Sequence, residues 1–562
     1  MFHKRGVIGI ALALVAIVAL YMLQFTTEAR EIVTVMNPHD AVFRDSEAVY
    51  RGLDPSSIVY FFVTITDTSD ATFFEVNAAR SYEPIVRADV IIQEGDRYGP
   101  LRGLLGFNER VPNARITQRA FGNNQRPQKS YSISLHDRAG TWRGMTTIAL
   151  NKHISDITRL RNQLAFDLLI DIPHITSTRT QFVRLFVRDE TKEFPDTMFV
   201  DFGLFTQVET INRTWLRNRG LDHTGSLYRA RNFNFELVPE IRLASDPLFD
   251  EEAFNEILEI RGSNDHRKLL AMLESINNEE IHINDTIDMF FDIDNYLTWL
   301  AINILFGHTT SSHEDFFLYS PSNTTRFLFL PWDFSSSLST LERELRGRHI
   351  HHFDLGLANF WESPLHRRFL MEEENRNLLT QRVEELLLEL TPERISDQLS
   401  NYIDIIRAHS FAMPDLLFLG ATPELIEEVF ALLPFELNRN YVHYKNSLVT
   451  PTPFRIDTPF YGNGNLHVNW NESISFFRDT VRYSIWINND WSFDDAIFEA
   501  HNLASITEVN LEMLPDGLYY VRVIAYDDMG NTRYASNFMR NADGYFIEGI
   551  MMFMVRNGVV IT

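Results

Sequence analysis

The chain has 562 residues, 45% hydrophobic and 23% charged, which is typical of a folded globular protein with two or three domains. Its formal net charge of −25 repels nucleic-acid phosphates, and no basic patch in the sequence offsets that repulsion, so a nucleic-acid partner is excluded. Cysteine is absent, which excludes disulfides, thiolate catalysis and cysteine-ligated metals, and leaves hard metals with oxygen ligands as the natural counter-ions.

An uncharged apolar stretch runs from Val7 to Phe25, directly after the basic residues Lys4 and Arg5. Its roughly 19 residues would cross about one bilayer core as a helix. The basic flank predicts that the N-terminus stays in the cytoplasm and that the bulk of the chain is extracytoplasmic. No Ala-x-Ala-like cleavage site follows the stretch closely. We therefore predict that residues 1–30 hold an uncleaved membrane anchor, with a cleaved signal peptide as the alternative.

An exposed spacer over residues 31–55 is expected to precede a β-rich region from about 56 to 240. That region combines β-branched or aromatic residues with turn signals, as in "SSIVYFFVTIT", "KSYSISL" and "TQFVRLFVRD". One helix is predicted to interrupt the strands, with Ser155 and Asp156 as its capping residues. Its apolar stripe recurs every four residues, at Leu160, Leu164 and Leu168.

From about residue 247 to 449 the pattern favours helices. The Thr-Pro-Glu sequences that begin at Thr391 and Thr422 each place a capping hydroxyl before a first-turn proline, which predicts a helix start. The first of these helices has a predicted buried stripe at Ile395, Leu399, Tyr402 and Ile406. Between the helices, "RFLFLP" predicts a strand buried on both faces, in an isolated hairpin or strand pair.

The segment "TPTPF" at residues 450–454 is predicted to be a stiff linker, because its prolines restrict the backbone. Beyond it, "VRYSIWI" and "GLYYVRVIAYDD" alternate apolar and polar residues as strands do. They resemble the late strands of a fibronectin type III or immunoglobulin-like sandwich. Residues 455–562 are therefore predicted to form an all-β sandwich that binds or spaces rather than catalyses.

Lys129 begins the predicted strand "KSYSISL" and shares a face with Tyr131 and Ile133, because alternate side chains of a strand point the same way. An ammonium group beside a core needs an anion, or it reaches solvent from the strand end. Glu209, at the end of "FGLFTQVET", is a possible partner, since a carboxylate at the end of a mostly apolar strand needs a cation.

Asp333 follows the apolar strand and Pro331, which ends its hydrogen-bond ladder. A carboxylate at the rim of a core caps a turn, pairs with a cation or binds a metal. Two interpretations stay open: Asp333 caps the serine-rich turn that follows, or it is a Mg²⁺ ligand together with phosphate oxygens. The loop from Arg119 to Gln128 would let backbone N–H groups approach a phosphate, although it lacks the Walker and dinucleotide fingerprints.

Several blocks, taken in order, carry a resemblance. The chain resembles the CotH family, the spore-coat protein H kinases, over roughly residues 56–400; the blocks are "NARITQRAFGNNQRPQKSYSISL", "LNKHISDITRLRNQLAFDLL", "FGLFTQVETINRTWLRNRGLDHTGSLYRA", "FDIDNYLTWLAINILFG" and "DFFLYSPSNTTRFLFLPWDF". The resemblance implies an α+β, atypical protein-kinase-like fold over residues 56–449, β-rich in its N-terminal part and helical in its C-terminal part. It also implies binding of ATP with Mg²⁺ or Mn²⁺ and phosphorylation of a secreted or spore-coat protein.

The resemblance assigns roles by position. Lys129 matches the lysine that meets the ATP phosphates, and Glu209 matches the acid of the block "G-x-Y-x-x-x-E", the expected partner of that lysine. Asp333 matches the metal-binding aspartate of a Pro-Trp-Asp segment. Arg119 and Asn123, in the loop before Lys129, are expected to help bind the nucleotide. The helix block that contains Arg161 and Asn162 matches an Arg-Asn block whose role is structural.

The sequence departs from the family pattern where the catalytic aspartate is expected, because "GHTTSSHEDFFLY" places Thr310 there. A threonine cannot accept a proton from a substrate hydroxyl at neutral pH. Asp315 stands at the position of a family asparagine and is expected to ligate metal, while Ser335 replaces a second acid. A displaced base is an open alternative, supplied by His308, His313 or Glu314.

The loop "RHIHHFD" holds His349, His351 and His352, whose spacing does not match a zinc-binding helix, so we interpret them as residues of a solvated or partly packed loop. Three hypotheses for the whole chain follow. It is an exported, membrane-anchored or spore-coat protein kinase that acts on serine or threonine, or a pseudokinase scaffold for envelope or coat assembly. The third is an extracellular binding protein that uses the C-terminal sandwich.

Overall fold

The computed structural model describes residues 43–79, 85–119, 127–192, 196–504, 508–512, 514–541 and 546–561. Contacts divide the chain into two units, Met1–Phe43 and Arg44–Thr562, and all described helices and strands belong to the second. The predicted membrane segment at residues 7–25 lies outside these ranges, so it stays a prediction. Within them, no helix has the length and apolar character that crossing a bilayer requires.

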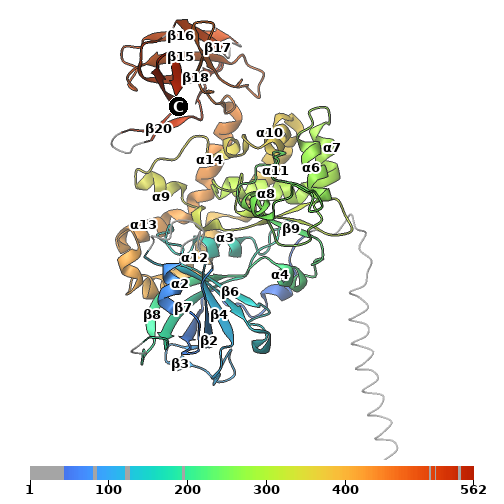
Figure 1. Cartoon of the computed structure of the whole chain (residues 1–562), viewed down its shortest axis with the longest axis vertical. Helices are drawn as coiled ribbons and strands as arrows, with labels where there is room; N and C mark the ends of the chain where they lie inside the picture. The colour runs from blue at the N-terminus through green and yellow to red at the C-terminus, as the bar shows by residue number, and fades with distance from the viewer. Residues whose placement is uncertain are drawn as a thin grey trace, which may run out of the picture. The chain divides into compact units, whose positions relative to one another are not determined.

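The β-rich region forms an eight-stranded sheet that closes on itself (Figure 1). Its order is β1-β7-β8-β6-β5-β4-β2-β3, and an additional pairing between β1 and β2 completes the ring. The β1–β7 pair is parallel and the other pairs are antiparallel. The strands are β1 (Ile58–Ile65), β2 (Arg87–Asp96), β3 (Gly99–Pro100), β4 (Ala114–Arg119), β5 (Ser130–Leu135), β6 (Thr147–Asn151), β7 (Thr180–Asp189) and β8 (Val200–Val208).

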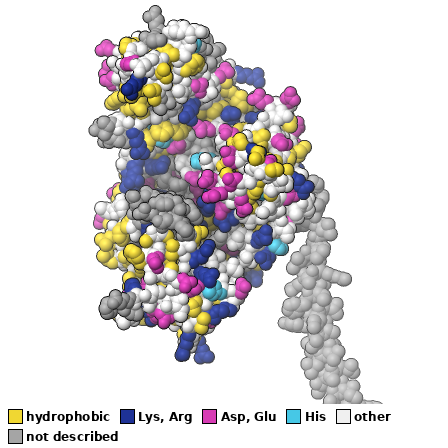
Figure 2. Space-filling view, in the orientation of Figure 1, with side chains coloured by type: hydrophobic (Ala, Val, Ile, Leu, Met, Phe, Trp, Pro, Cys, Tyr) yellow, Lys and Arg dark blue, Asp and Glu magenta, His cyan; other side chains and the backbone are white. Residues whose placement is uncertain are grey.

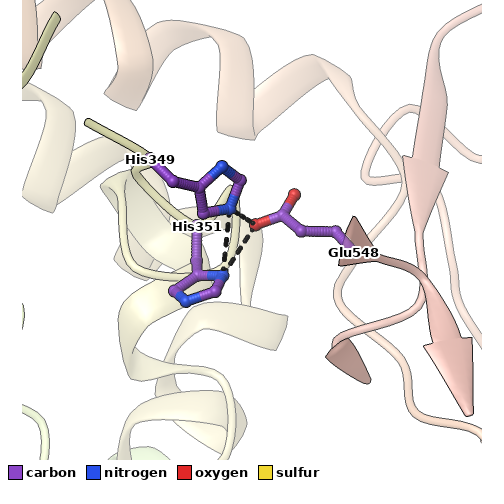
Figure 3. A group of neighbouring side chains, drawn as sticks. All are labelled: His349, His351 and Glu548. Atoms are coloured by element: carbon purple, nitrogen blue, oxygen red, sulfur yellow. Dashed lines mark hydrogen bonds and ion pairs between the residues drawn. The ribbon is translucent and has the colours of Figure 1, made fainter. Parts of the chain in front are cut away.

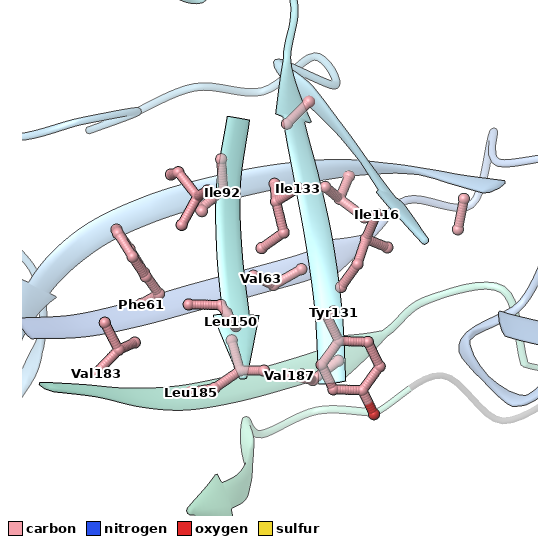
Figure 4. Packing of buried hydrophobic residues seen from close by; sticks show 14 of the residues in the cluster. Phe61, Val63, Ile92, Ile116, Tyr131, Ile133, Leu150, Val183, Leu185 and Val187 are labelled. Atoms are coloured by element: carbon pink, nitrogen blue, oxygen red, sulfur yellow. The ribbon is translucent and has the colours of Figure 1, made fainter. Parts of the chain in front are cut away.

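The inside of this closed sheet is a hydrophobic core, shown in Figure 4. Alternation along each strand places one set of side chains inward, as the pleat of a strand requires. Tyr131 and Ile133 of β5 belong to the buried core, while Ser134 of the same strand is exposed. The predicted alternation of the strand "KSYSISL" is therefore confirmed. Helix α2 (Phe73–Ala78) adds Phe73 and Val76 to the same core.

Helix α3 (Arg161–Leu168) starts later than predicted. Leu160, not Ser155 or Asp156, is its N-cap residue and makes no capping hydrogen bond. The Asp156 side chain instead accepts hydrogen bonds from the backbone N–H groups of Thr158, at 2.8 Å, and Arg161, at 3.0 Å. Asp156 thus closes a turn before the helix and satisfies a free N–H group at its start. The predicted stripe of Leu160, Leu164 and Leu168 is buried.

The part of the chain after β8 is mainly helical. Both predicted Thr-Pro-Glu helix starts are confirmed: the hydroxyl of Thr391 accepts a hydrogen bond from Arg394 N, and that of Thr422 from Leu425 N. The predicted stripe of the first helix is buried. The helices are α4 (Arg213–Asn218), α5 (Glu251–Ile257), α6 (Arg267–Ile276), α7 (Ile283–Phe290), α8 (Ile293–Leu305), α9 (Thr340–Leu345), α10 (Pro364–Met371), α11 (Glu373–Glu389), α12 (Pro392–His409), α13 (Pro423–Leu432) and α14 (Glu436–Val449).

A second, four-stranded sheet lies among these helices, in the order β10-β9-β11-β12. It contains β9 (Ser226–Ala230), β10 (Leu258–Ile260), β11 (Phe316–Ser320) and β12 (Leu328–Pro331). The predicted strand at "RFLFLP" is therefore present, but its hairpin is not isolated, because β9 pairs with β11. Helix α8 is buried along most of its length and contacts β12, so the sheet packs against a helix of the protein interior.

The C-terminal domain consists of β-sheets, as predicted. One sheet has the order β13-β14-β17, and the other β16-β15-β18-β22-β23 with β19 beside β18. Leu466 of the first sheet and Ile485 of the second belong to one buried core. The strands are β13 (Phe460–Gly462), β14 (Asn465–Asn469), β15 (Arg482–Asn488), β16 (Phe498–Ala504), β17 (Glu508–Glu512), β18 (Gly517–Tyr526), β19 (Thr532–Tyr534), β22 (Ile550–Arg556) and β23 (Val559–Ile561), with a separate hairpin of β20 (Phe538–Arg540) and β21 (Phe546–Glu548).

Two connecting segments are more firmly held than the sequence suggested. Residues 451–454 of the predicted linker are buried, and Arg533 donates hydrogen bonds to Pro451 O at 2.7 Å and Thr450 Oγ1 at 2.6 Å. In the predicted spacer, the Asp45 side chain is only 2% exposed and pairs with Arg219.

Figure 2 shows many Asp and Glu side chains on the helical part in this view, in keeping with the negative net charge.

Candidate functional site

Asp333 lies just beyond the end of β12, in a left-handed backbone conformation with φ of 43°. Its Oδ1 accepts a hydrogen bond from Ser335 N at 3.3 Å, so the capping role predicted from the sequence is confirmed. Burial raises the pKa of Asp333, but the neighbouring His153, the hydrogen bonds from Ser335 and the charge of Arg229 outweigh it and lower the pKa overall. The carboxylate is therefore held ionised at the rim of the core.

Two adjacent residues of α3, Asn162 and Arg161, hold the segments around Asp333 in place. Asn162 Oδ1 accepts a hydrogen bond from Phe334 N at 3.0 Å, and Asn162 Nδ2 lies 3.2 Å from His153 Nε2. Arg161, next in the chain, is fully buried between Asp156 and Glu342, at 2.8 and 2.6 Å. Asn162 thus positions the aspartate turn, while Arg161 ties α3 to α9, as expected for a structural block.

Two arginines approach the Asp333 region from different sheets. The guanidinium carbons of Arg119, at the end of β4, and Arg229, in β9, lie 5.7 and 5.9 Å from the centroid of the Trp332 ring. Burial and the neighbouring Arg229 charge lower the pKa of Arg119 to about 10, and Asp333 opposes this. Among the described residues, neither arginine forms an ion pair with a carboxylate within 4 Å. Both positive charges are therefore available to an anion.

Asp315 precedes β11 and lies beside Trp332, whose backbone N–H group donates to Asp315 O at 3.1 Å. Its φ of 60° is also left-handed. Thr310 Oγ1 donates a hydrogen bond to Asp315 Oδ2 at 2.7 Å and lies 3.2 Å from His308 Nε2. Asp315 and Asp333 thus stand at the adjoining ends of the paired strands β11 and β12.

His308 is completely buried, and its Nδ1 lies 2.9 Å from Asn303 Oδ1. The Asn303 amide nitrogen donates to Trp299 O, so Asn303 Oδ1 is the acceptor and His308 Nδ1 is the donor. The other ring nitrogen, His308 Nε2, lies 3.2 Å from Thr310 Oγ1 and 3.6 Å from Asp315 Oδ2. His313 and Glu314, which the sequence also offered as a displaced base, are half-buried in the same loop.

Lys129 lies at the same end of the closed sheet as Arg119, because Arg119 pairs with Ser130 across β4 and β5. Alternation nevertheless places Lys129 on the inward face with Tyr131, whereas Arg119 shares the outward face with Ser130. Burial lowers the pKa of Lys129. The two expected phosphate contacts thus start from opposite faces, and it is Arg119 whose charge interacts with Asp333. Asn123, the third expected nucleotide contact, lies outside the described residues.

The expected pair between Lys129 and Glu209 is wrong. Glu209 binds Arg179 at 2.6 Å and Arg219 at 3.0 Å, and Arg219 also pairs with Asp45 at 2.9 Å. The strand register explains the separation: Glu209 follows Val208, which lies level with Ser132 through β6. Glu209 is therefore two strands from Lys129 and about 13 Å farther along the sheet. It belongs to a buried network of four charges that anchors residues before β1.

A different lysine is buried at this end of the sheet. Lys152 Nζ lies 2.7 Å from Asp415 Oδ1 and donates to Leu204 O at 2.8 Å. Burial lowers the pKa of Lys152 to about 8, against the opposing charge of Asp415. A Cβ at Gly203, whose φ is +80°, would lie 2.0 Å from Asp415 Oδ2. Gly203, the glycine of the block "G-x-Y-x-x-x-E", therefore leaves room for the Asp415 carboxylate. The Lys152–Asp415 pair joins the helical part to the closed sheet.

The residues around Asp333 fit a metal-bound polyphosphate. The site residues Arg119, Arg229, Asp315 and Asp333, called the arginine–aspartate cluster below, supply two carboxylates and two guanidinium groups. Carboxylates suit Mg²⁺ or Mn²⁺, and guanidinium groups suit phosphate oxygens. Within the part that the structure describes, Arg229 Nε is buried and has no hydrogen-bond partner. A buried donor without an acceptor is costly, and a phosphate oxygen would supply one.

The sequence predicted three members of this cluster and missed Arg229. The available signal was an arginine within "SLYRA", a strand whose other residues are buried. His153 was also missed; it follows β6 with a φ of 47°, and no sequence pattern relates it to Asp333.

Comparison with known proteins gives two matches. Residues 117–414, just over half of the chain, match the family model described as CotH kinase protein. The inner spore coat protein H of Bacillus subtilis (strain 168) is 22% identical over 298 residues, which cover 52% of this chain and 75% of that protein. The matched region contains every member of the arginine–aspartate cluster and ends just before Asp415.

Proposed function

Because this chain belongs to the CotH kinase family, we propose that it binds ATP with Mg²⁺ or Mn²⁺ and transfers the γ-phosphoryl group to serine or threonine of a coat or cell-surface protein. The observation that carries the proposal is that Arg119 and Arg229 meet at one tryptophan ring and that the charges of Asp315 and Asp333 act on Arg229. The coat assignment rests on the name of the Bacillus subtilis relative. Export, with residues 7–25 as anchor or signal, belongs to the same proposal.

Each residue of the cluster has a role in this proposal. Metal-bound ATP supplies the transferable phosphoryl group. Arg119 and Arg229 hold phosphate oxygens, and Lys129 adds charge at the adjoining end of the sheet. Asp333 is the principal metal ligand, since the hydrogen bonds from Ser335 and the charge of Arg229 favour its ionised carboxylate. Glu209 has no phosphate contact in this account and stabilises the fold.

Asp315 takes two roles that the family divides between two positions. Its Oδ2 lies one hydrogen bond from Thr310, where the family aspartate is expected. A carboxylate there accepts the proton that an acceptor hydroxyl loses as its oxygen bonds to phosphorus. The second oxygen, Oδ1, remains for the metal. Because phosphoryl transfer depends mostly on positioning and electrostatics, one aspartate in both roles sustains a slower reaction.

A nucleotide-binding pseudokinase is the second candidate, favoured by one observation. The Thr310 hydroxyl already donates to the Asp315 oxygen that would accept the proton, so that oxygen is engaged before substrate arrives. In this case the protein uses nucleotide binding and its β-rich C-terminal domain as a scaffold for coat or envelope assembly.

Transfer of labelled phosphate from ATP distinguishes the two functions. Wild type and Asp333→Ala are incubated with labelled ATP, Mg²⁺ and a coat or surface protein extract, with nucleotide binding measured in parallel. The kinase proposal predicts incorporation by wild type alone. Binding without incorporation selects the pseudokinase, and equal incorporation by both proteins rejects the role of Asp333.

A further inference from the structure

Two histidines and a glutamate from distant parts of the chain meet away from the arginine–aspartate cluster. His349 and His351 lie in the loop between α9 and the short helix η4 (Gly356–Phe360), and Glu548 ends β21. Figure 3 shows both imidazole rings and the carboxylate turned toward one another. In the described part of the chain, this is the group of three His, Asp or Glu side chains whose possible ligand atoms all lie within 4.8 Å.

The three ligand atoms form a nearly equilateral triangle. His349 Nε2 and His351 Nδ1 are each 2.9 Å from Glu548 Oε1 and 3.2 Å from each other. Ligand atoms at the zinc–nitrogen and zinc–oxygen distances of about 2.0–2.1 Å stand about 3.3–3.4 Å apart in a tetrahedral site. Outward shifts of a few tenths of an ångström therefore convert the triangle into three corners of a zinc tetrahedron.

The triangle brings the two ring nitrogens within 3.2 Å of each other as well as within 2.9 Å of one carboxylate oxygen. If both facing nitrogens carry protons, two N–H groups converge on one oxygen and lie against each other. If one nitrogen lacks a proton, its lone pair faces the Glu548 carboxylate at 2.9 Å, so two acceptors oppose each other. A cation between the three atoms turns every one of these lone pairs into a favourable ligand.

Carboxylates that bind a metal usually accept hydrogen bonds from a neighbouring residue, and His352 is that neighbour of Glu548. Its Nε2 lies 3.0 Å from Tyr534 O. Its Nδ1 lies 2.5 Å from Glu548 Oε2, the oxygen turned away from the triangle, and its backbone N–H group donates to Oε1 at 3.2 Å. His352 thereby fixes the carboxylate that both other histidines face.

The donor types and the surroundings determine which ion fits. Two imidazole nitrogens and one carboxylate oxygen match Zn²⁺ and its transition-metal neighbours, whereas Mg²⁺ and Ca²⁺ prefer oxygen donors. The Phe546 ring lies 5.7 Å from His349 and 4.8 Å from His351, so apolar groups restrict both imidazoles. A cavity of about 910 Å³ is lined by His349, His352 and Glu548 and gives an ion a path of entry.

We propose that His349 Nε2, His351 Nδ1 and Glu548 Oε1 bind one divalent transition-metal ion of the Zn²⁺ type. The ion links the loop after α9 to the β20–β21 hairpin of the C-terminal domain. The fourth position belongs to water or to a small anion from the cavity. The site is separate from the arginine–aspartate cluster, so it requires neither nucleotide nor phosphoryl transfer.

Calorimetric titration of the full-length, chelator-treated protein with ZnCl₂ tests the proposal. The buffer contains neither Mg²⁺ nor nucleotide and is kept at about pH 7.5, where ordinary histidines are neutral. Wild type is expected to bind Zn²⁺ at one strong site. The variant His349→Ala/His351→Ala is expected to lose at least about 100-fold in affinity, because removal of two ligands exceeds the 10–100-fold cost of losing an outer partner.

His501→Ala is the matched control, because His501 is an exposed histidine of the same C-terminal domain, 52% exposed. It should bind Zn²⁺ as wild type does. Co²⁺ provides a second readout: wild type should show the visible absorption of tetrahedral cobalt, and the double variant should not. Far-UV circular dichroism checks folding; if the double variant unfolds, Glu548→Gln replaces it, with a loss of at least about tenfold expected. Equal Zn²⁺ affinity in wild type and variant, or a preference for Mg²⁺, overturns the proposal.

Discussion

The hydroxyl of Thr310 donates a hydrogen bond of 2.7 Å to the carboxylate of Asp315. Thr310 stands where the CotH pattern expects an aspartate, and Asp315 stands where it expects an asparagine. The two departures from the family pattern are therefore in direct contact. The resemblance predicts a carboxylate on the Thr310 side of this contact, and the chain carries one on the Asp315 side.

Exchanging these two residues should increase phosphoryl transfer. The double variant Thr310→Asp/Asp315→Asn restores the family arrangement, and we expect it to incorporate phosphate about 10–100-fold faster than wild type, within the usual gain from general-base catalysis. The single variant Asp315→Asn removes the only carboxylate of the pair and should be slower than wild type by about 100-fold. Initial rates with labelled ATP are compared at saturating Mg-ATP, because Asp315 is also a proposed metal ligand and its substitution changes nucleotide affinity. A double variant no faster than Asp315→Asn would show that this contact has no part in catalysis.

Arg229→Gln should weaken nucleotide binding. A guanidinium that donates to phosphate contributes about 1.5–3 kcal/mol, so the Kd for Mg-ATP should rise about 10–100-fold. Arg115→Gln removes the same charge from an exposed position on β4, where Arg115 pairs with Asp89 at 2.8 Å, and should leave the Kd nearly unchanged. Calorimetric titration at one ionic strength compares the three proteins. Equal weakening by both substitutions would point to general electrostatics and against a direct contact.

Glu209→Gln should destabilise the fold without affecting nucleotide affinity. The substitution leaves Arg179 and Arg219 buried with less negative charge, which costs about 3–5 kcal/mol when one partner of a buried pair is lost. Glu190→Gln breaks a surface pair with Arg188 instead and should cost less than about 1 kcal/mol. Urea unfolding measures the free energies. A large rise in the Kd for Mg-ATP with unchanged stability would contradict the structural role of Glu209 and support a direct contact with the nucleotide.

Glu436 should make stability depend on pH. It is completely buried, and burial raises its pKa from 4.5 to about 7, although hydrogen bonds from Leu341 N and the charge of Arg161 lower it. A carboxyl group with a raised pKa in the folded protein contributes stability below about pH 4.5, and that contribution is lost as the pH rises through about 7. The difference is up to about 3 kcal/mol.

Glu436→Gln removes this titration, so it should be less sensitive than wild type to a change from pH 5 to pH 8 and more stable than wild type at pH 8. Urea unfolding at both values provides the comparison. If wild type and variant lose stability in parallel between these pH values, the raised pKa of Glu436 is refuted.

Local patterns in the sequence predicted local structure well. The hydroxyls of Thr391 and Thr422 cap helices because capping requires residues that are neighbours in the chain. The alternation in β5 and β18 predicted buried faces because the pleat of a strand has a period of two residues. The start of α3 was placed too early because Asp156 bonds a turn that no periodicity reveals.

Contacts between distant residues were harder to predict. The Lys129–Glu209 pair was wrong because a sequence gives no strand register, and the register separates them. Glu209 forms ion pairs with Arg179 and Arg219 instead. The histidines of "RHIHHFD" were interpreted as a solvated or partly packed loop, and their contact with Glu548 was not predicted, because Glu548 is nearly 200 residues away. The metal-binding role of Asp333 stays a prediction, which the resemblance supplied because spacing alone left capping and metal binding open.

Titration of the full-length protein with ATP, with and without Mg²⁺, tests the central claim most directly. The account predicts saturable binding that requires the metal and that Asp333→Asn weakens at least about tenfold, since the variant loses a charged metal ligand. Glu190→Gln, on the surface of the closed sheet, should bind as wild type does. Binding of equal strength in wild type and Asp333→Asn, or no binding by wild type at millimolar ATP, would contradict the account.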